Sequence, residues 1–95
     1  MNKILDSEQY LSPTEFSSAV SAITSAFGDP TRRDIYLHVR TCQEGMTASE
    51  ISEKFDLHTN VARHHLDKLA AGGYLDVGRS ATTGAGRPAK IYSCS

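Results

Sequence analysis

The residue types needed to read DNA bases occur together in one short stretch, at Thr59, Asn60, Arg63 and His64. Asn can form two hydrogen bonds with adenine, Arg can do the same with guanine, and Thr can donate or accept one. At about 100° per residue, Asn60, Arg63 and His64 fall on one arc of a helix, opposite an arc of mainly apolar side chains. The stretch therefore predicts a recognition helix over about 59–71 with a polar face for base contacts.

Basic residues are concentrated in the same half of the chain. Residues 58–95 carry five Lys and Arg against two Asp and Glu, a net charge of +3 with His neutral. Residues 1–57 carry five against nine, a net charge of −4, so the 95-residue chain as a whole stands at −1. A nucleic acid is therefore expected at the basic half. The basic candidates outside residues 59–64 are Lys68, Arg79, Arg87 and Lys90.

Capping signals predict the helices that must position these side chains. Residues 12–15, Ser-Pro-Thr-Glu, form a capping box with Pro at the first helical position. The first helix should end at Gly28, which is suited to the left-handed backbone of many helix ends. Asp29-Pro30 predicts the start of a second helix by the same logic, and Gly45 is expected to end it.

The next stretch predicts two helices joined by a tight turn. Residues 47–50, Thr-Ala-Ser-Glu, are a second capping box and open a short helix. Residues 56–58 form the turn, and the helix over about 59–71 follows it. A short helix, a tight turn and a second helix with a polar face are the helix-turn-helix layout, in which the second helix lies in the major groove of DNA. Thr47 and Ser49, at the start of the short helix, are then candidates for holding a phosphate.

The remaining sequence predicts a two-stranded hairpin, or wing, over about 74–93. Residues 74–77 alternate like a strand, residues 78–86 form a loop rich in Gly, Ser, Thr and Ala, and residues 89–93 form the returning strand. Arg87 would lie at the tip, with Arg79 and Lys90 on the arms, where they can reach the minor groove or the DNA backbone. The predicted fold is mainly α with a small β-hairpin: a winged helix-turn-helix of three to four helices plus a two-stranded wing. Residues 1–12 are a lead-in segment and 13–95 the domain.

Apolar positions give a candidate core and a candidate dimer surface. Phe16, Val20, Ile23 and Phe27 form a stripe on the first helix that we expect in the core. Ala19, Ala22 and Ala26 form a second face of small side chains, which favours close packing against the first helix of a second subunit. Cys42 shares a face with Ile35 and Val39 and is expected to be a small buried group.

Other classes of function find little support in the sequence. His65 lies within the apolar arc of the recognition helix and is expected to be a hydrogen-bonded core residue and no metal ligand. Cys42 and Cys94 match no zinc or disulfide spacing, and no catalytic or phosphate-loop motif appears. We therefore expect no enzyme, cofactor or metal. No apolar run approaches the roughly 18 residues of a membrane span, and the first residues lack a signal-peptide pattern, so we expect a cytoplasmic protein without a membrane partner.

These motifs, in this order, resemble the ArsR-like family of bacterial winged helix-turn-helix regulators. The resemblance covers roughly residues 14–93 and is most specific to the SufR-type branch, in which a Gly-Arg-Pro wing precedes a sensory domain. It is carried by residues 27–33 (FGDPTRR), 57–69 (LHTNVARHHLDKL), 73–75 (GYL), 84–88 (GAGRP) and 91–92 (IY).

The resemblance implies a homodimer that binds palindromic double-stranded DNA and represses transcription until an effector intervenes. It also implies base reading by Asn60, Arg63 and His64, and a wing contact by Arg87. The paired cysteines of the metal-sensing members are absent, since residues 51–55 read ISEKF. The chain stops where SufR-type members continue into their sensor, so it is expected either to be a fragment or to be regulated elsewhere, by an unknown effector. The alternative function is a winged-helix module that binds protein.

Overall fold

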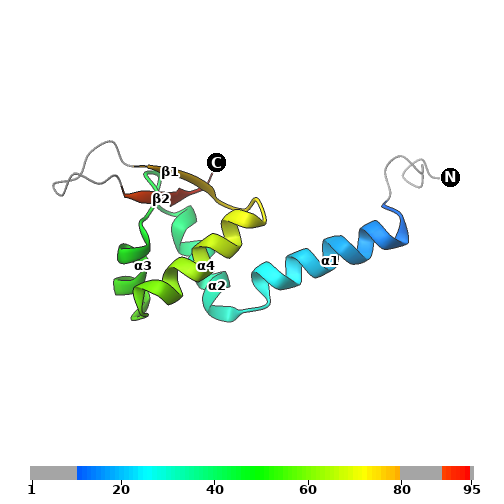
Figure 1. The fold of residues 1–95 in the computed structure, drawn as a ribbon, viewed down its shortest axis with the longest axis horizontal. Coiled ribbons are helices and arrows are strands. Elements are labelled where there is room, and N and C mark those ends of the chain that lie inside the picture. The colour runs from blue at the N-terminus through cyan, green and yellow to red at the C-terminus, as the bar shows by residue number, and fades with distance from the viewer. Residues whose placement is uncertain (1–10, 80–88, 95) are drawn as a thin grey trace.

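The computed structural model describes residues 11–79 and 89–94, which form four helices followed by a two-stranded antiparallel sheet. The helices are α1 (Pro13–Phe27), α2 (Pro30–Arg40), α3 (Ala48–Phe55) and α4 (Thr59–Ala71). The strands are β1 (Asp76–Arg79) and β2 (Lys90–Ser93), paired so that Val77 faces Tyr92 and Arg79 faces Lys90. This order confirms the predicted winged helix-turn-helix fold (Figure 1).

Both predicted capping boxes form, and with the same geometry. The Ser12 hydroxyl accepts from the Glu15 amide at 3.1 Å, and the Glu15 carboxylate accepts from the Ser12 amide at 2.8 Å. Thr47 and Glu50 repeat these two bonds at the same distances at the start of α3. Such reciprocal bonds satisfy amides that the first helical turn leaves without a partner, which explains why the helices begin at these residues.

The core lies between α2, α3, α4 and the sheet. Its fully buried large side chains come from all four of these elements: Ile35, Val39, Ile51, Leu66, Leu69 and Tyr92. The backbone of Tyr92 also exchanges two hydrogen bonds of 2.9 Å with Met46, just ahead of α3. The wing is therefore attached to the helix-turn-helix through both side-chain packing and backbone pairing.

The expectation that the α1 stripe is core is wrong for the single chain. Phe16, Val20 and Ile23 keep 60%, 45% and 53% of their surface exposed. The reason is geometric, because α1 extends away from the other elements and meets them only near its C-terminal end (Figure 1). There Ala26 is buried, and the Phe27 ring stands edge-on to Tyr74 at 4.7 Å between ring centroids.

Helix α2 ends earlier than the sequence predicted. It stops at Arg40, and the Thr41 hydroxyl donates to the His38 carbonyl at 2.7 Å, which satisfies one carbonyl of the last turn. Cys42 therefore lies in the following turn and is half-buried, not buried as expected. Gly45 has a φ of +81°, and a Cβ there would lie 2.7 Å from the Tyr92 carbonyl oxygen. Glycine at this position lets the turn lie against β2.

Three smaller expectations also need correction. Gly28 caps α1 with a right-handed φ of −72°, whereas Gly73, after α4, has a left-handed φ of +83°. Val61 falls on the mainly apolar arc predicted for residues 59–71 and was expected to face inward, but it is 44% exposed because it lies at the edge of that arc, in the first turn of α4. Strand β1 begins at Asp76 and includes Gly78 and Arg79, since only from Asp76 does the chain pair with β2. No helix within residues 11–79 or 89–94 has the length and hydropathy that crossing a bilayer requires.

Candidate nucleic-acid interface

The start of α4 is positioned by the turn that precedes it. Asp56 has a left-handed φ of 55°, which ends α3 and redirects the chain into α4. His58, expected only to be part of the turn, is the N-cap of α4: its Nδ1 accepts from the Asn60 amide at 3.1 Å. The Thr59 hydroxyl lies 3.4 Å from that of Ser52, whose own hydroxyl donates to the Ser49 carbonyl at 2.7 Å. Side-chain bonds thus fix the two helices of the motif to each other.

Asn60 and Arg63 are exposed and hydrogen-bonded to each other. The Arg63 guanidinium donates through Nη1 to Asn60 Oδ1 at 2.7 Å. The two side chains predicted to read bases therefore stand side by side on the solvent face of α4, one helical turn apart. His64 is exposed next to them. This face carries hydrogen-bonding groups with the reach that base edges require.

The opposite face of α4 is held in the core by a polar link as well as by apolar packing. Arg32 Nε donates to His65 Nδ1 at 3.2 Å, and Arg32 Nη1 donates to the Ser25 carbonyl near the end of α1 at 2.5 Å. His65 is thus the hydrogen-bonded core histidine that the sequence predicted. Burial lowers its pKa, an effect that the Asp29 carboxylate opposes and the Arg32 and His64 charges reinforce.

A hollow of about 170 Å³ brings together predicted site residues that are distant in the sequence. It lies where the start of α3, the start of α4 and β2 meet. Arg63 and Lys90 give it positive charge, and the N-terminal end of α3 adds the partial positive charge of a helix dipole. Its polar lining consists of Thr47, Ser49, Thr59, Arg63, Lys90 and Tyr92. Cations, hydroxyls and a helix N-terminus around one small hollow suit a phosphate group.

Lys68 and Arg79 lie outside this hollow. Lys68 is in the last turn of α4, where its ammonium donates to the Ser25 hydroxyl of α1 at 3.1 Å. Arg79 is exposed at the end of β1, opposite Lys90 on the neighbouring strand. Arg87 lies outside the residues that the structure describes.

Sequence reasoning assigned no site role to Asp67 or Tyr92. Asp67 Oδ1 accepts from the Tyr92 hydroxyl at 2.5 Å and from the Lys90 ammonium at 3.4 Å. Burial and the Asp67 hydrogen bond both raise the pKa of Tyr92, so the hydroxyl stays protonated as a donor. A signal was present, because Lys90 and Tyr92 are two residues apart on a strand and therefore share one face. The sequence did not show that this face meets Asp67.

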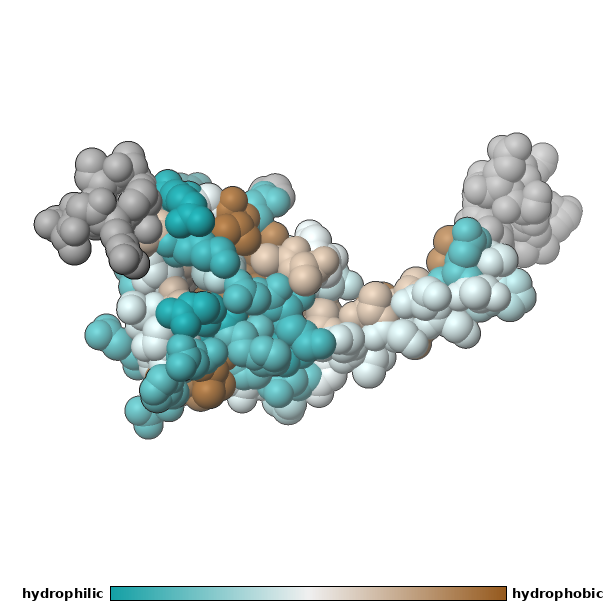
Figure 2. All heavy atoms as spheres, in the orientation of Figure 1, coloured by the Kyte–Doolittle hydropathy of each residue, from teal (hydrophilic) through white to brown (hydrophobic). Residues whose placement is uncertain are grey.

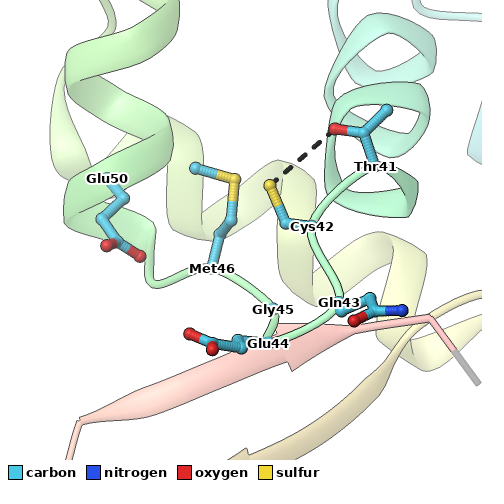
Figure 3. A pocket seen from close by; sticks show the side chains of 7 residues that line it. All are labelled: Thr41, Cys42, Gln43, Glu44, Gly45, Met46 and Glu50. Carbon is cyan, nitrogen blue, oxygen red and sulfur yellow. Dashed lines mark hydrogen bonds between the residues drawn. The ribbon is translucent and has the colours of Figure 1, made fainter.

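A larger hollow of about 620 Å³ has a different chemistry. It is formed by the turn between α2 and α3, with Thr41, Cys42 and Met46 among its lining (Figure 3). Glu44 and Glu50 give it two carboxylates, and its lining contains no Lys, Arg or His. Because a phosphate would meet negative charge there, this hollow is a poor site for nucleic acid.

Surface hydropathy separates the body of the molecule from α1. In Figure 2, hydrophilic residues cover most of the face of the body that is in view, whereas paler and apolar residues run along α1. The exposed polar side chains of α4, including Asn60 and Arg63, belong to the hydrophilic body. The two regions therefore present different chemistry to a partner.

Comparison with known proteins agrees with this geometry. A family model described as a helix-turn-helix domain matches residues 27–77, which is more than half of the chain. The crystal structure of NolR from Sinorhizobium fredii superposes with a TM-score of 0.67 at 27% sequence identity, covering 92% of this chain and 81% of that one. No curated protein matches the chain.

Proposed function

This chain belongs to the helix-turn-helix domain family, and we propose that it binds specific double-stranded DNA as a homodimeric transcriptional repressor of the cytoplasm. The observation that carries the proposal is the hollow between α3, α4 and β2. It unites Arg63, Lys90 and the N-terminal end of α3 beside the exposed side chain of Asn60. The proposed function needs no catalytic residue, cofactor or metal.

The fold gives each part of this interface a place on the duplex. The N-terminal turns of α4 enter the major groove, where Asn60 pairs with adenine and Arg63 with guanine. Thr47 and Ser49 present the start of α3 to a backbone phosphate at the hollow. The hairpin of β1 and β2 lies beside α4, so that Lys90 and Arg79 reach the backbone or the minor groove.

The exposed face of α1 supports dimerisation. Phe16, Val20 and Ile23 are large apolar side chains left about half exposed in the single chain, next to the small side chains of Ala19 and Ala22. Pairing with the α1 of a second copy would cover them, and the ArsR-like resemblance implies such a dimer. The repressor role and the response to an effector also come from that resemblance.

Selection from random duplexes tests the DNA-binding proposal. Bound duplexes are recovered at two salt concentrations and sequenced, and affinities are measured by fluorescence anisotropy. We expect an inverted repeat with half-sites about one helical turn, or roughly 10 base pairs, apart. Weak, sequence-independent binding that disappears at physiological salt would contradict the proposal and leave a protein-binding module as the function.

Variants of two arginines test the base-reading face. Arg63→Ala should weaken binding to the selected duplex by about 1–3 kcal/mol and relax the preference at one base position. Arg33→Ala is the matched control, because it removes the same charge from an exposed position on α2. Equal losses for the two variants would mean that Arg63 contributes only net charge.

Sedimentation tests the dimer. Analytical ultracentrifugation at tens of micromolar should show a dimer for the unmodified chain and a monomer for Ile23→Glu, which introduces charge into the apolar face of α1. Ser21→Glu, at an exposed position on a different face of the same helix from the Phe16, Val20 and Ile23 stripe, is the control. A monomeric unmodified chain would refute dimerisation through α1.

A further inference from the structure

The recognition helix carries one carboxylate directly beside the cations of the interface. Asp67 Oδ1 accepts from Lys90 Nζ at 3.4 Å and from the Tyr92 hydroxyl at 2.5 Å. Lys90 lines the hollow together with Arg63, which lies one turn before Asp67 on α4. A carboxylate of this chain therefore stands where a DNA phosphate would be attracted.

The two partners of Asp67 differ in how firmly they are held. Tyr92 is fully buried and its backbone is bonded in both directions to Met46, so the hydroxyl has a fixed place. The Lys90 and Asp67 side chains are 44% and 47% exposed, and their 3.4 Å separation exceeds the usual length of a charge-assisted hydrogen bond. A half-exposed ion pair of this kind contributes little stability, so another anion can replace the carboxylate at the Lys90 ammonium at little energetic cost.

We propose that Asp67 is an internal competitor of the DNA backbone: it holds Lys90 in the free protein, and a DNA phosphate takes its place in the complex. This inference rests on the proposed DNA binding and adds a residue that tunes it. The exchange swaps one oxygen anion for another at the Lys90 ammonium. Asp67 keeps the Tyr92 hydrogen bond throughout, so its carboxylate is never left without a donor.

The consequence is a built-in limit on affinity. Attraction between Lys or Arg and phosphate supplies most of the sequence-independent binding of a protein to DNA. Asp67 offsets part of that attraction at the hollow, because it holds the Lys90 ammonium that a phosphate would otherwise contact. Removing its charge should therefore strengthen binding to any duplex, through Lys90 in particular.

The test measures binding of a random-sequence duplex by fluorescence anisotropy at low salt. Asp67→Asn keeps an oxygen that can accept from Tyr92 but has no charge, and it should bind about three- to tenfold more tightly than the unmodified chain. Asp34→Asn, on the exposed face of α2, makes the same change in net charge and should bind less than about twofold more tightly. Thermal melting of each variant checks that it folds.

A double-mutant cycle with Lys90 decides the mechanism. In the Lys90→Ala background, Asp67→Asn should increase the affinity for the duplex only slightly, because the cation for which phosphate and carboxylate compete is gone. A gain that persists without Lys90, or one no larger than that of Asp34→Asn, would overturn the inference and leave DNA binding intact. If the unmodified chain binds no duplex even at low salt, the proposed function itself fails.

Discussion

Helix α1 and the recognition unit, defined as residues 30–79 and 89–94, use similar sequence signals with opposite results. Both α1 and α3 begin with a capping box, and both α1 and α4 carry an apolar stripe at helical spacing. In α4 the inward side chains Ala62, His65, Leu66 and Leu69 are all buried. In α1 only Ala26 is buried. An apolar stripe therefore predicts which face of a helix is apolar, but it does not show that other parts of the same chain pack against that face.

The difference has an energetic meaning. Full burial of a Val, Leu, Ile or Phe side chain stabilises a fold by about 1.5–3 kcal/mol. Leu66 and Leu69 contribute this stabilisation within one chain because they are fully buried, whereas Phe16 and Ile23 are exposed and do not. The recognition unit is thus expected to be stable by itself, while α1 leaves large apolar side chains exposed in the single chain.

Truncating one apolar side chain in each region should give the largest contrast. Leu66→Ala leaves a cavity in the fully buried core and should lower the free energy of unfolding by about 2–5 kcal/mol. Phe16→Ala should change it by less than about 0.5 kcal/mol at concentrations where the chain is monomeric. Urea denaturation measures both. Similar losses would mean that α1 folds back onto the body in solution.

Lowering the pH should act on the recognition unit through His65. The Arg32 hydrogen bond requires an unprotonated Nδ1, and burial lowers the pKa of His65 below its ordinary value of 6.5. The neutral form is thus favoured in the folded state. Its stabilising contribution is fully present above about pH 6.5 and is lost as the pH falls through the lowered pKa.

Urea denaturation between pH 7.5 and 5 checks this direction. His65→Gln supplies an amide oxygen that can accept from Arg32 but does not titrate in this range, so its unfolding free energy should depend less on pH. An equally steep loss in His65→Gln would place the titrating group elsewhere.

Local signals predicted most of the recognition unit. The boundaries of α4, the capping residue Asp29 and the core role of His65 follow from short-range periodicity and side-chain chemistry. The turn after α2 was harder to predict, because Gly45 lies against β2, about half a chain away. Gly45 looked like a helix end in the sequence, but its backbone is set by the close approach of Tyr92.

The candidate site also has one part that local sequence patterns predict and another that depends on long-range contacts. The residues proposed to read bases share one helix face, and periodicity alone could group Asn60 with Arg63. The link from Asp67 to Tyr92 and Lys90 joins residues 25 and 23 positions apart, respectively, so no local pattern contains it. The exposure of Val20 and Ile23 was also unpredictable, since it depends on the direction in which α1 leaves the body.

The smallest expected effect comes from the two capping boxes, which have equal hydrogen-bond lengths and very different surroundings. Thr47→Ala removes the cap of α3, whose Ile51 is fully buried, and should lower the free energy of unfolding by about 1 kcal/mol. Ser12→Ala removes the equivalent cap of α1, where the surrounding side chains are exposed. It should leave global unfolding unchanged and only speed hydrogen exchange in the first turns of α1, because that end opens without disturbing the core. Urea denaturation and amide exchange of both variants measure the contrast. Equal global losses would show that the far end of α1 is cooperative with the recognition unit, as it would be in a dimer whose two copies of α1 are paired.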